Sequence, residues 1–278
     1  MRIGFIGAGR MGAPMAARLA AAGHEVRVLG RTDETRSALA DLGLTAVADP
    51  TEVADGADAV VLCVFSDEQV RAVCLDGPLL GALPRGALLV VHTTGAPDTV
   101  GAVAAAAARY GVGVVDAPVS GGPHDIARGT LTVFLGGGDV EIARAREVLG
   151  AYADPVLHVG PLGAGQRVKL VNNALFAAQI GLVAEAVRLA GELGVEETTL
   201  LHALPHASGG SRALAGIAAK GSVDGFGSAV GEFLRKDIAV TRALAGALGA
   251  NLGLLAAAIE AGVPPEAASA PTEGLPHA

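Results

Sequence analysis

The chain has 278 residues, of which 51% are hydrophobic and 17% are charged, and its formal net charge is -8 at pH 7. This composition supports a sizeable buried core and excludes wholesale disorder. The acidic balance argues against nucleic acid as a partner, because proteins that bind nucleic acid normally present a basic face.

The cysteines and the apolar segments indicate a reducing, aqueous compartment. Cys63 and Cys74 are too few for a disulfide framework, and Cys63 lies in an apolar run, as a buried inert thiol would. The N-terminal MRIGFIGAG reaches glycines too early for a signal peptide. The most membrane-like segment, 174–193, contains three charged residues and so indicates a core helix. We therefore expect a cytoplasmic protein with no membrane association.

The first half of the chain alternates apolar strands with helical patterns, such as the helices predicted at 11–23 and 33–43. This alternation favours an α/β fold in which helices cover both faces of a parallel sheet. The strands are predicted at residues 2–7, 24–30, 59–65, 87–94, 112–120 and 131–137.

From about residue 163 the pattern becomes helical and shows no clear strand. The Gly- and Pro-rich segment HVGPLGAG precedes this change and indicates a domain boundary. We predict an N-terminal α/β domain at 1–162, an interdomain helix at 163–193 and a helical C-terminal domain at 194–278. The Pro- and Ala-rich tail from residue 262 is expected to be mobile or loosely docked. Helices are predicted at about 165–193, 195–206, 209–219, 228–249 and 251–261.

The motif GAGRMG follows the first strand and opens the first helix. Gly7 permits a tight turn, Gly9 lets the backbone approach a pyrophosphate, and Gly12 lets helix and strand pack closely. In this position the motif predicts dinucleotide binding, although a packing turn is the alternative in a chain with 40 glycines. The remaining loop residues assigned to the cofactor are Ala8, Arg10 and Met11.

The end of the second strand bears on the choice between NAD and NADP. Arg31 can pair with a 2′-phosphate and Thr32 can donate a hydrogen bond to it, whereas NAD usually requires an acidic residue here. Asp33 comes slightly later and opposes the assignment. The sequence favours NADP, with NAD as the alternative, and Arg31 could instead be a solvated surface charge.

Two further strand ends carry polar residues. In DAPVSGG, Ser120 is followed by Gly121 and Gly122, which offer a hydroxyl and two open backbone N–H groups for a carboxylate, or else an ordinary turn. Thr93 and Thr94 follow the previous strand, at the sheet edge where ligands bind in α/β folds.

The helix in GAGQRVKLVNN places Lys169, Asn172 and Asn173 on one face, ahead of an apolar stretch. Late in the chain, FLRKDI sets Lys236 beside Asp237, which could be a surface charge pair of little energetic weight.

Together GFIGAGRMGAPMA, DAPVSGG, GAGQRVKLVNN and GFGSAVGEFLRKDI resemble the β-hydroxyacid dehydrogenase family, which includes 3-hydroxyisobutyrate dehydrogenase. The segments come in family order over about residues 3–240. The resemblance implies an N-terminal Rossmann domain, a long connecting helix, an all-α C-terminal domain and a homodimer or homotetramer. It also implies NAD(P)-dependent interconversion of a small β-hydroxy acid with its semialdehyde or keto acid.

The resemblance implies residue roles as well. Lys169 matches the catalytic general acid/base, and Asn173 matches a residue that helps hold the substrate. The carboxylate-binding loop matches Ser120, Gly121 and Gly122, of which Ser120 is also assigned to catalysis. The cofactor side matches Phe65, Ser66, Thr94 and Lys236, with Asp237 beside that lysine.

The chemistry favours a lysine independently. Oxidation of a hydroxy acid removes the hydroxyl proton as hydride leaves, and the reverse reaction needs a proton donor. Burial and a second cation such as Lys236 lower the pKa of a lysine toward the neutral range, where it serves both directions.

Some departures and alternatives remain. His92 stands where many relatives have Asp or Ser. His202 and His206 are spaced i, i+4, but no third ligand is evident and Pro205 lies between them, so we expect no metal. An imine reductase and a non-catalytic NADP-binding protein are the alternative functions, and neither accounts for Lys169.

Overall fold

The computed structural model describes residues 1–262, and these form two compact units. The first unit is Met1–Leu170 and the second begins at Val171, so the boundary falls inside the long helix α9 (Ala164–Glu192). Nearly all of the tail that was predicted to be mobile lies outside the described residues.

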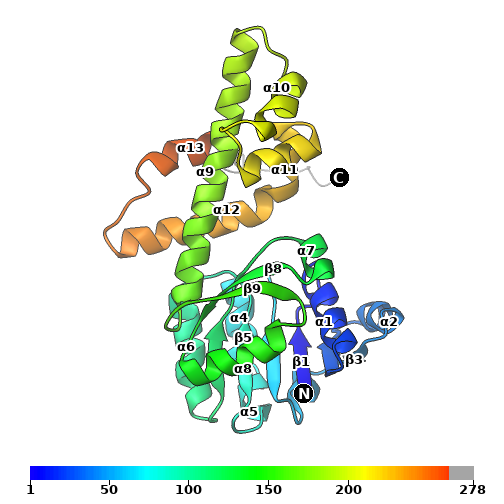
Figure 1. The fold of residues 1–278 in the computed structure, drawn as a ribbon. Coiled ribbons are helices and arrows are strands. Elements are labelled where there is room, and N and C mark those ends of the chain that lie inside the picture. The colour runs from blue at the N-terminus through cyan, green and yellow to red at the C-terminus, as the bar shows by residue number, and fades with distance from the viewer. Residues whose placement is uncertain (263–278) are drawn as a thin grey trace, which may run out of the picture. The chain divides into compact units, whose positions relative to one another are not determined.

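The first unit is built on a nine-stranded sheet in the order β3-β2-β1-β4-β5-β6-β8-β7, with β9 paired to β8 (Figure 1). From β3 to β6 all neighbouring strands are parallel, as predicted. The strands are β1 (Arg2–Ile6), β2 (Glu25–Leu29), β3 (Thr45–Val47), β4 (Ala59–Leu62), β5 (Leu88–Val91), β6 (Gly113–Asp116), β7 (Val119–Ser120), β8 (Leu131–Gly136) and β9 (Ala153–Gly160).

One edge of this sheet departs from the parallel prediction. β8 pairs antiparallel with β6 and with β7, where Ser120 lies opposite Thr132. The short strand β3 and the longer β9 were not predicted, and the single strand predicted at 112–120 is divided into β6 and β7. β9 has no continuous apolar run because it pairs with β8 as an outer strand and leaves several side chains exposed, among them Leu157.

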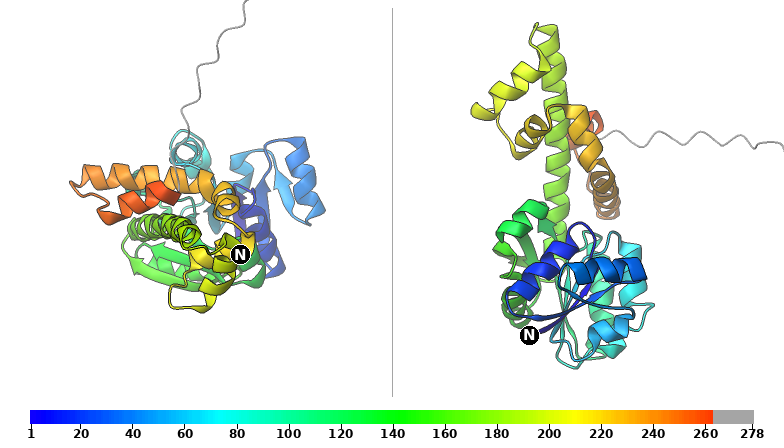
Figure 2. Two further views of the ribbon diagram at one scale, coloured as in Figure 1. Left: turned by 90° about the horizontal axis from the view of Figure 1, so that it is seen from above. Right: turned by 90° about the vertical axis from the view of Figure 1, so that its right-hand side faces the viewer.

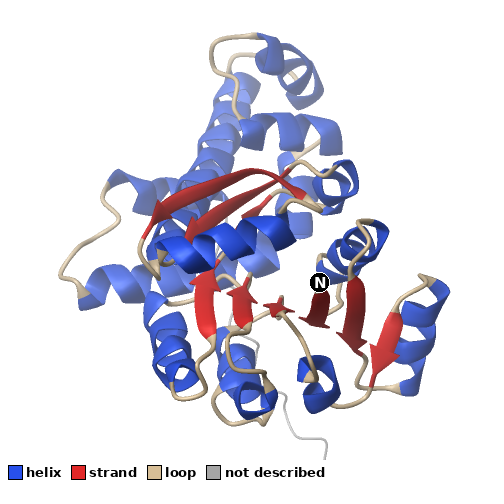
Figure 3. Ribbon diagram, turned by 60° about the horizontal axis from the view of Figure 1, so that its bottom comes forward, coloured by secondary structure: helices blue, strands red, loops and turns tan. Residues whose placement is uncertain are grey.

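The strands bury alternate residues in two separate cores. Phe5, Val61 and Val90 belong to one core, whereas their neighbours Leu62 and Leu89 belong to the other. This two-residue alternation follows from the pleat of a β-strand, and it requires helices on both faces, as Figure 3 shows. The first core is covered by α1 (Gly12–Ala21), α2 (Asp33–Asp41), α7 (Pro123–Arg128) and α8 (Asp139–Leu149), and the second by α3 (Pro50–Ala54), α4 (Asp67–Cys74), α5 (Leu79–Ala82) and α6 (Pro97–Ala108).

In the second unit, helices pack around the C-terminal part of α9 (Figure 2). The closest approach is between α9 and α13, where a Cβ atom on Gly181 would lie 1.7 Å from the carbonyl oxygen of Ala258, and one on Gly262 would lie 2.3 Å from the Gly181 nitrogen. The other helices are α10 (Glu197–Ala203), η1 (Leu204–His206), α11 (Arg212–Lys220), α12 (Val223–Ala247) and α13 (Leu254–Gly262).

Within residues 1–262, α9 is the one helix long and apolar enough to cross a membrane, with a mean hydropathy of 1.4 over its most apolar window. Its buried residues Ala177, Ile180 and Val183 contribute to the core of the second unit. Near its C-terminal end Arg188 forms ion pairs with Glu185 and Glu192. These contacts fit the core helix that was predicted for this segment.

Candidate active site

The glycine loop between β1 and α1 has the geometry that a pyrophosphate requires. Gly7 has a φ of 99°, and a Cβ atom there would lie 2.1 Å from the carbonyl oxygen of Cys63. Gly9 is exposed, with open space where its Cβ would be, and a Cβ on Gly12 would lie 2.1 Å from the Gly7 oxygen. No described side chain caps α1, so its first N–H groups suit an anionic acceptor. These residues fit a dinucleotide.

At the end of β2, the predicted residues Arg31 and Thr32 are both exposed. The Thr32 hydroxyl caps α2 by accepting a hydrogen bond from the Thr35 N–H at 3.2 Å. Arg36, which was not predicted, donates from Nη1 to the carbonyl oxygen of Gly30 at 2.7 Å and forms an ion pair with Asp33. Its spacing of three residues from Asp33 is the sequence signal that could have identified it.

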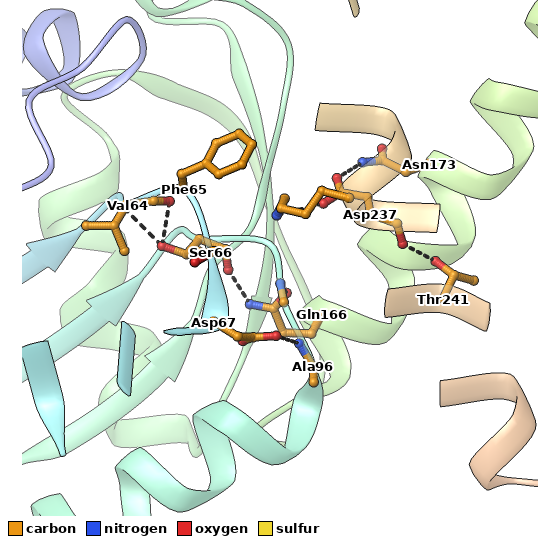
Figure 4. A network of polar contacts seen from close by, with 12 residues as sticks. Val64, Phe65, Ser66, Asp67, Ala96, Gln166, Asn173, Asp237 and Thr241 are labelled. Carbon is orange, nitrogen blue, oxygen red and sulfur yellow. Dashed lines mark hydrogen bonds and ion pairs between the residues drawn. The ribbon is translucent and has the colours of Figure 1, made fainter. Parts of the chain in front are cut away.

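The loops after β4 and β5 are joined by hydrogen bonds. The Thr93 hydroxyl bonds both the N–H and the carbonyl of Val64 at 3.0 Å, and Asp67 accepts from the Ala96 N–H at 2.8 Å (Figure 4). This places the predicted cofactor residues of the two loops on one connected segment of the sheet edge.

Three of those predicted residues differ in exposure. Phe65 exposes 48% of its surface, whereas Ser66 and Thr94 are half-buried. Ser66 caps α4, and the amide oxygen of Gln69 accepts from the Phe65 N–H at 2.7 Å. An exposed aromatic ring held on a fixed backbone is suited to contact with a bound ligand.

His92 directly follows β5 and is buried. Its Nδ1 donates to the carbonyl oxygen of Ala117 at 2.5 Å, which leaves Nε2 to accept from the Tyr152 hydroxyl at 2.7 Å. Burial lowers the pKa of His92 to about 4, and it raises the pKa of Tyr152. The neutral imidazole therefore anchors the strand end that leads to Ser120.

In the predicted carboxylate loop, Ser120 is half-buried in β7 and Gly121 has a φ of 134°. The prediction of two open N–H groups was wrong at Gly122, because its N–H donates to Oδ2 of Asp125 at 2.8 Å. Asp125 is the third residue of α7, and its side chain accepts from the N–H of Gly122, the residue before the helix. This contact is one half of a capping box, a pattern that the sequence could have indicated. Arg128 and His124 pair with the same carboxylate.

The base of α9 is bound to two strand ends of the same unit. The buried carboxylate of Asp116 accepts from the N–H groups of Gly163 at 2.6 Å and Gln166 at 2.7 Å. The Gln166 side chain accepts from the Gly95 N–H at 3.0 Å and donates to the carbonyl oxygen of Thr93 at 2.8 Å. Lys169 follows one turn later and is 9% exposed.

Burial raises the pKa of Asp116, and its two backbone donors act in the opposite direction. Neither Asp116 nor Gln166 was predicted to have a role, although Asp116 lies in DAPVSGG and Gln166 in GAGQRVKLVNN. Their partners are 47 to 73 positions distant in the chain, so no local pattern identifies these contacts.

In the second unit, Asn173 donates from Nδ2 to Oδ2 of the buried Asp237 at 2.5 Å (Figure 4). Asn172 donates to the Asn173 amide oxygen at 3.0 Å, which fixes the orientation of that amide. The Lys236 ammonium lies 2.8 Å from Oδ1 of Asp237 but outside hydrogen-bonding geometry, so this contact is an ion pair. Lys236 is 81% shielded from solvent, since its side chain is 19% exposed.

The remaining candidates are a histidine pair and a cysteine. The rings of His202 and His206 are 6.3 Å apart, and within residues 1–262 no group of three His, Cys, Asp or Glu side chains could hold a metal ion. Burial raises the pKa of the Cys63 thiol to about 12, as expected for an inert cysteine.

Comparison with known families gives two matches that together span most of the chain. Residues 2–160 match the NAD-binding domain of 6-phosphogluconate dehydrogenase. Residues 163–267 match the NAD-binding domain of NADP-dependent 3-hydroxyisobutyrate dehydrogenase.

Two relatives from Pseudomonas aeruginosa are each 36% identical to this chain. One is an NAD-dependent L-serine dehydrogenase, aligned over 77% of this chain and 72% of its own length. The other is a 3-hydroxyisobutyrate dehydrogenase, aligned over 76% of this chain and 72% of its own length.

Among solved structures, the chain is similar to Mycobacterium tuberculosis 3-hydroxyisobutyrate dehydrogenase with L-serine. The TM-score is 0.82 at 31% identity, covering 94% of this chain and 92% of that one. An imine reductase from a Pseudomonas species shares the fold, with a TM-score of 0.65 at 20% identity, covering 94% of this chain and 98% of that one.

Proposed function

Since this chain belongs to the β-hydroxyacid dehydrogenase family of NAD(P)-dependent oxidoreductases, we propose that it interconverts a small β-hydroxy acid and its semialdehyde or keto acid, with Lys169 as general acid/base. The observation that carries the proposal is the burial of Lys169 on α9. The first turn of this helix is hydrogen-bonded to the loop after β5 and to the end of β6. A solvated surface lysine would need neither this burial nor a helix end fixed by hydrogen bonds. Relatives that act on 3-hydroxyisobutyrate and L-serine support a substrate with one carboxylate and a β-hydroxyl.

In the oxidative direction, Lys169 accepts the proton of the substrate hydroxyl, and a nicotinamide cofactor, when bound, would supply the acceptor for the hydride that leaves the same carbon. In the reductive direction, the lysine donates that proton to the carbonyl oxygen. Proton transfer by a positioned side chain contributes about 10²–10⁴-fold to such a reaction.

Substrate recognition in this proposal uses Ser120, Gly121 and Asn173. The Ser120 hydroxyl and the Gly121 backbone bind the carboxylate, and Gly122 shapes the loop, since its own N–H is bonded to Asp125. Asn173 has one N–H committed to Asp237 and its oxygen to Asn172, so its second N–H remains the donor suited to the substrate hydroxyl.

For the cofactor we propose NADP, with NAD as the alternative. Arg31 and Thr32 lie exposed at the end of β2, where the 2′ position of the adenosine ribose binds in this type of fold. Arg36 adds a second guanidinium beside them. Phe65, Ser66, Thr94 and Lys236 are proposed to approach the nicotinamide side.

We also propose a cytoplasmic homodimer or homotetramer. Leu175, Leu182 and Leu189 recur every seven residues on α9 and expose 49%, 60% and 49% of their surfaces. A regular apolar stripe of this length on a helix is typical of a protein interface.

The first experiment is a spectrophotometric screen at 340 nm, the nicotinamide absorbance. Purified protein is tested with 3-hydroxyisobutyrate, 3-hydroxypropionate, serine and glycerate, and with succinic and tartronic semialdehydes, using NADP(H) and NAD(H). We expect turnover with at least one of these substrates. No turnover with any of them would contradict the proposed substrate class.

With the best substrate, Lys169→Ala should lower kcat about 10²–10⁴-fold, as expected when a general acid/base is lost. Cofactor affinity, measured by fluorescence titration, should change less than twofold. The matched control is Lys220→Ala, which removes an exposed lysine at the end of α11. A Lys169→Ala enzyme that keeps more than a tenth of the wild-type rate would remove this lysine from the mechanism.

A further inference from the structure

The foot of α9 has no capping side chain of its own, because the residue before the helix is Gly163. The positive end of the helix is instead met by Asp116, which comes from the end of β6 and is fully buried. Its two oxygens accept from the N–H of Gly163, just before the helix, and from the N–H of Gln166 in the first turn. Two accepting oxygens suit an ionised carboxylate, whose oxygens both act only as acceptors.

The surrounding chain is shaped around this carboxylate. A Cβ on Gly136 would lie 2.4 Å from Oδ1 of Asp116, and a Cβ on Gly165 would lie 2.8 Å from Oδ2 and 2.4 Å from the carbonyl oxygen of Phe134. Side chains at either glycine would therefore displace the carboxylate or the helix. The Asp116 carboxylate therefore fits here only because positions 136 and 165 are glycines.

Gln166 joins the same turn to the other strand end. Its amide oxygen accepts from the Gly95 N–H, and its amide nitrogen donates to the carbonyl oxygen of Thr93. The residue is 2% exposed. Figure 4 shows Gln166 close to Ala96, whose N–H donates to the carboxylate of Asp67 at the start of α4. Thus three strand-end loops and the base of α9 form one hydrogen-bonded network within the first unit.

We propose that Asp116 and Gln166 are positioning residues, which fix the first turn of α9 and thereby the placement of Lys169 between the Thr93–Gly95 loop and the Ser120 loop. This inference rests on the function proposed above. Lys169 lies three residues after Gln166, on the same side of the helix. Ser120 lies four residues after Asp116, and its strand position is set by the pairing with Thr132. Each of the two residues therefore couples the helix to one loop.

The test combines hydrogen exchange with kinetics on Asp116→Asn, Gln166→Met and Gln166→Glu. The asparagine keeps one acceptor, so one N–H of the first turn loses its partner, and exchange at residues 163–168 should rise at least tenfold. A misplacement of about 1 Å lowers rates by up to about 100-fold, so kcat should fall 10- to 100-fold with cofactor affinity within twofold of wild type. Gln166→Glu keeps the acceptor for Gly95 but sets a carboxylate oxygen against the Thr93 carbonyl, so its kcat should fall at least as far as that of Gln166→Met.

Val148→Ala is the matched control, because it opens a cavity at a fully buried position of α8 whose apolar side chain makes no hydrogen bond in this network. It should lower the melting temperature without changing kcat per folded enzyme or exchange at residues 163–168. The inference is overturned if the Asp116 and Gln166 variants behave like Val148→Ala, or if exchange rises while kcat stays within twofold of wild type.

The two proposals fail in different ways. If Lys169→Ala keeps its activity, the proposed function fails, whatever the exchange data show. If Lys169→Ala is inactive but exchange and kcat are unchanged in Asp116→Asn and Gln166→Met, the function stands and the positioning role fails.

Discussion

Arg31 is the residue whose charge bears most directly on cofactor choice. Arg31→Asp should change the ratio of kcat/KM for NADP over NAD by roughly 10- to 100-fold toward NAD, because a charge-assisted hydrogen bond contributes about 1.5–3 kcal/mol. Initial rates with both cofactors measure this ratio. Arg109→Asp, at an exposed position after α6, is the control for the change in net charge. An unchanged ratio in Arg31→Asp would exclude a 2′-phosphate contact.

His92 gives the protein a dependence of stability on pH. Its pKa is about 4 in the folded protein and 6.5 in the unfolded chain, so the unfolded state binds the proton more readily. The contribution of His92 to stability is therefore largest above pH 6.5 and falls as the pH drops toward 4, by about 3 kcal/mol in total.

Urea unfolding at pH 7.5, 6.0 and 5.0 measures this effect against His92→Gln. The glutamine can donate to Ala117 and accept from Tyr152, yet it does not titrate. The variant should therefore lose less stability over this range than wild type. Equal losses in the two proteins would show that His92 is not the group responsible.

At the scale of the secondary-structure elements, α9 and α13 depend on close backbone contact. Gly181→Ala places a methyl group 1.7 Å from the Ala258 oxygen, so α13 must move. We expect a loss of at least about 1–3 kcal/mol in the free energy of unfolding, the usual cost of overpacking. Gly191→Ala is a matched control in the same helix, where a Cβ meets nothing within 4 Å. It should raise stability by about 0.5–1 kcal/mol through helix propensity, and equal effects of the two substitutions would contradict the close contact.

The predicted and the missed secondary-structure elements differ in how clearly their sequences are patterned. The strands β1, β4 and β5 were predicted because they are largely apolar runs, and β2 because its apolar residues lie in a short segment that ends in glycine. The long helix was predicted because its apolar pattern persists. β9 was missed because an outer strand buries little, and Pro155 and several exposed residues interrupt its pattern.

Site residues divide in the same way. The glycine loop is encoded within six consecutive residues, so the sequence identifies it directly. The contacts of Asp116 and Gln166 depend on tertiary folding, and only the structure brings those segments together. The hydrogen bond between the Gly122 N–H and Asp125 joins residues only three positions apart, so the helix-capping pattern could have predicted it.

For the whole molecule, the leucine stripe on α9 predicts self-association. Leu182→Glu puts a charge at its centre and should shift the protein to monomers in light scattering coupled to gel filtration. Leu248→Glu is the control, since Leu248 is 71% exposed and lies off this stripe. A wild-type protein that is monomeric at high concentration, or a Leu182→Glu protein that still associates, would contradict the proposed interface.

The carboxylate of Asp116 occupies space that side chains at positions 136 and 165 would otherwise take. Natural selection is therefore expected to treat these three sites as a single unit. Homologues that replace the acid with a smaller neutral residue should be the ones that tolerate alanine or larger at the two glycines, whereas homologues that keep the acid should keep both glycines. A deep alignment would show this covariation even in branches of the family that act on other substrates.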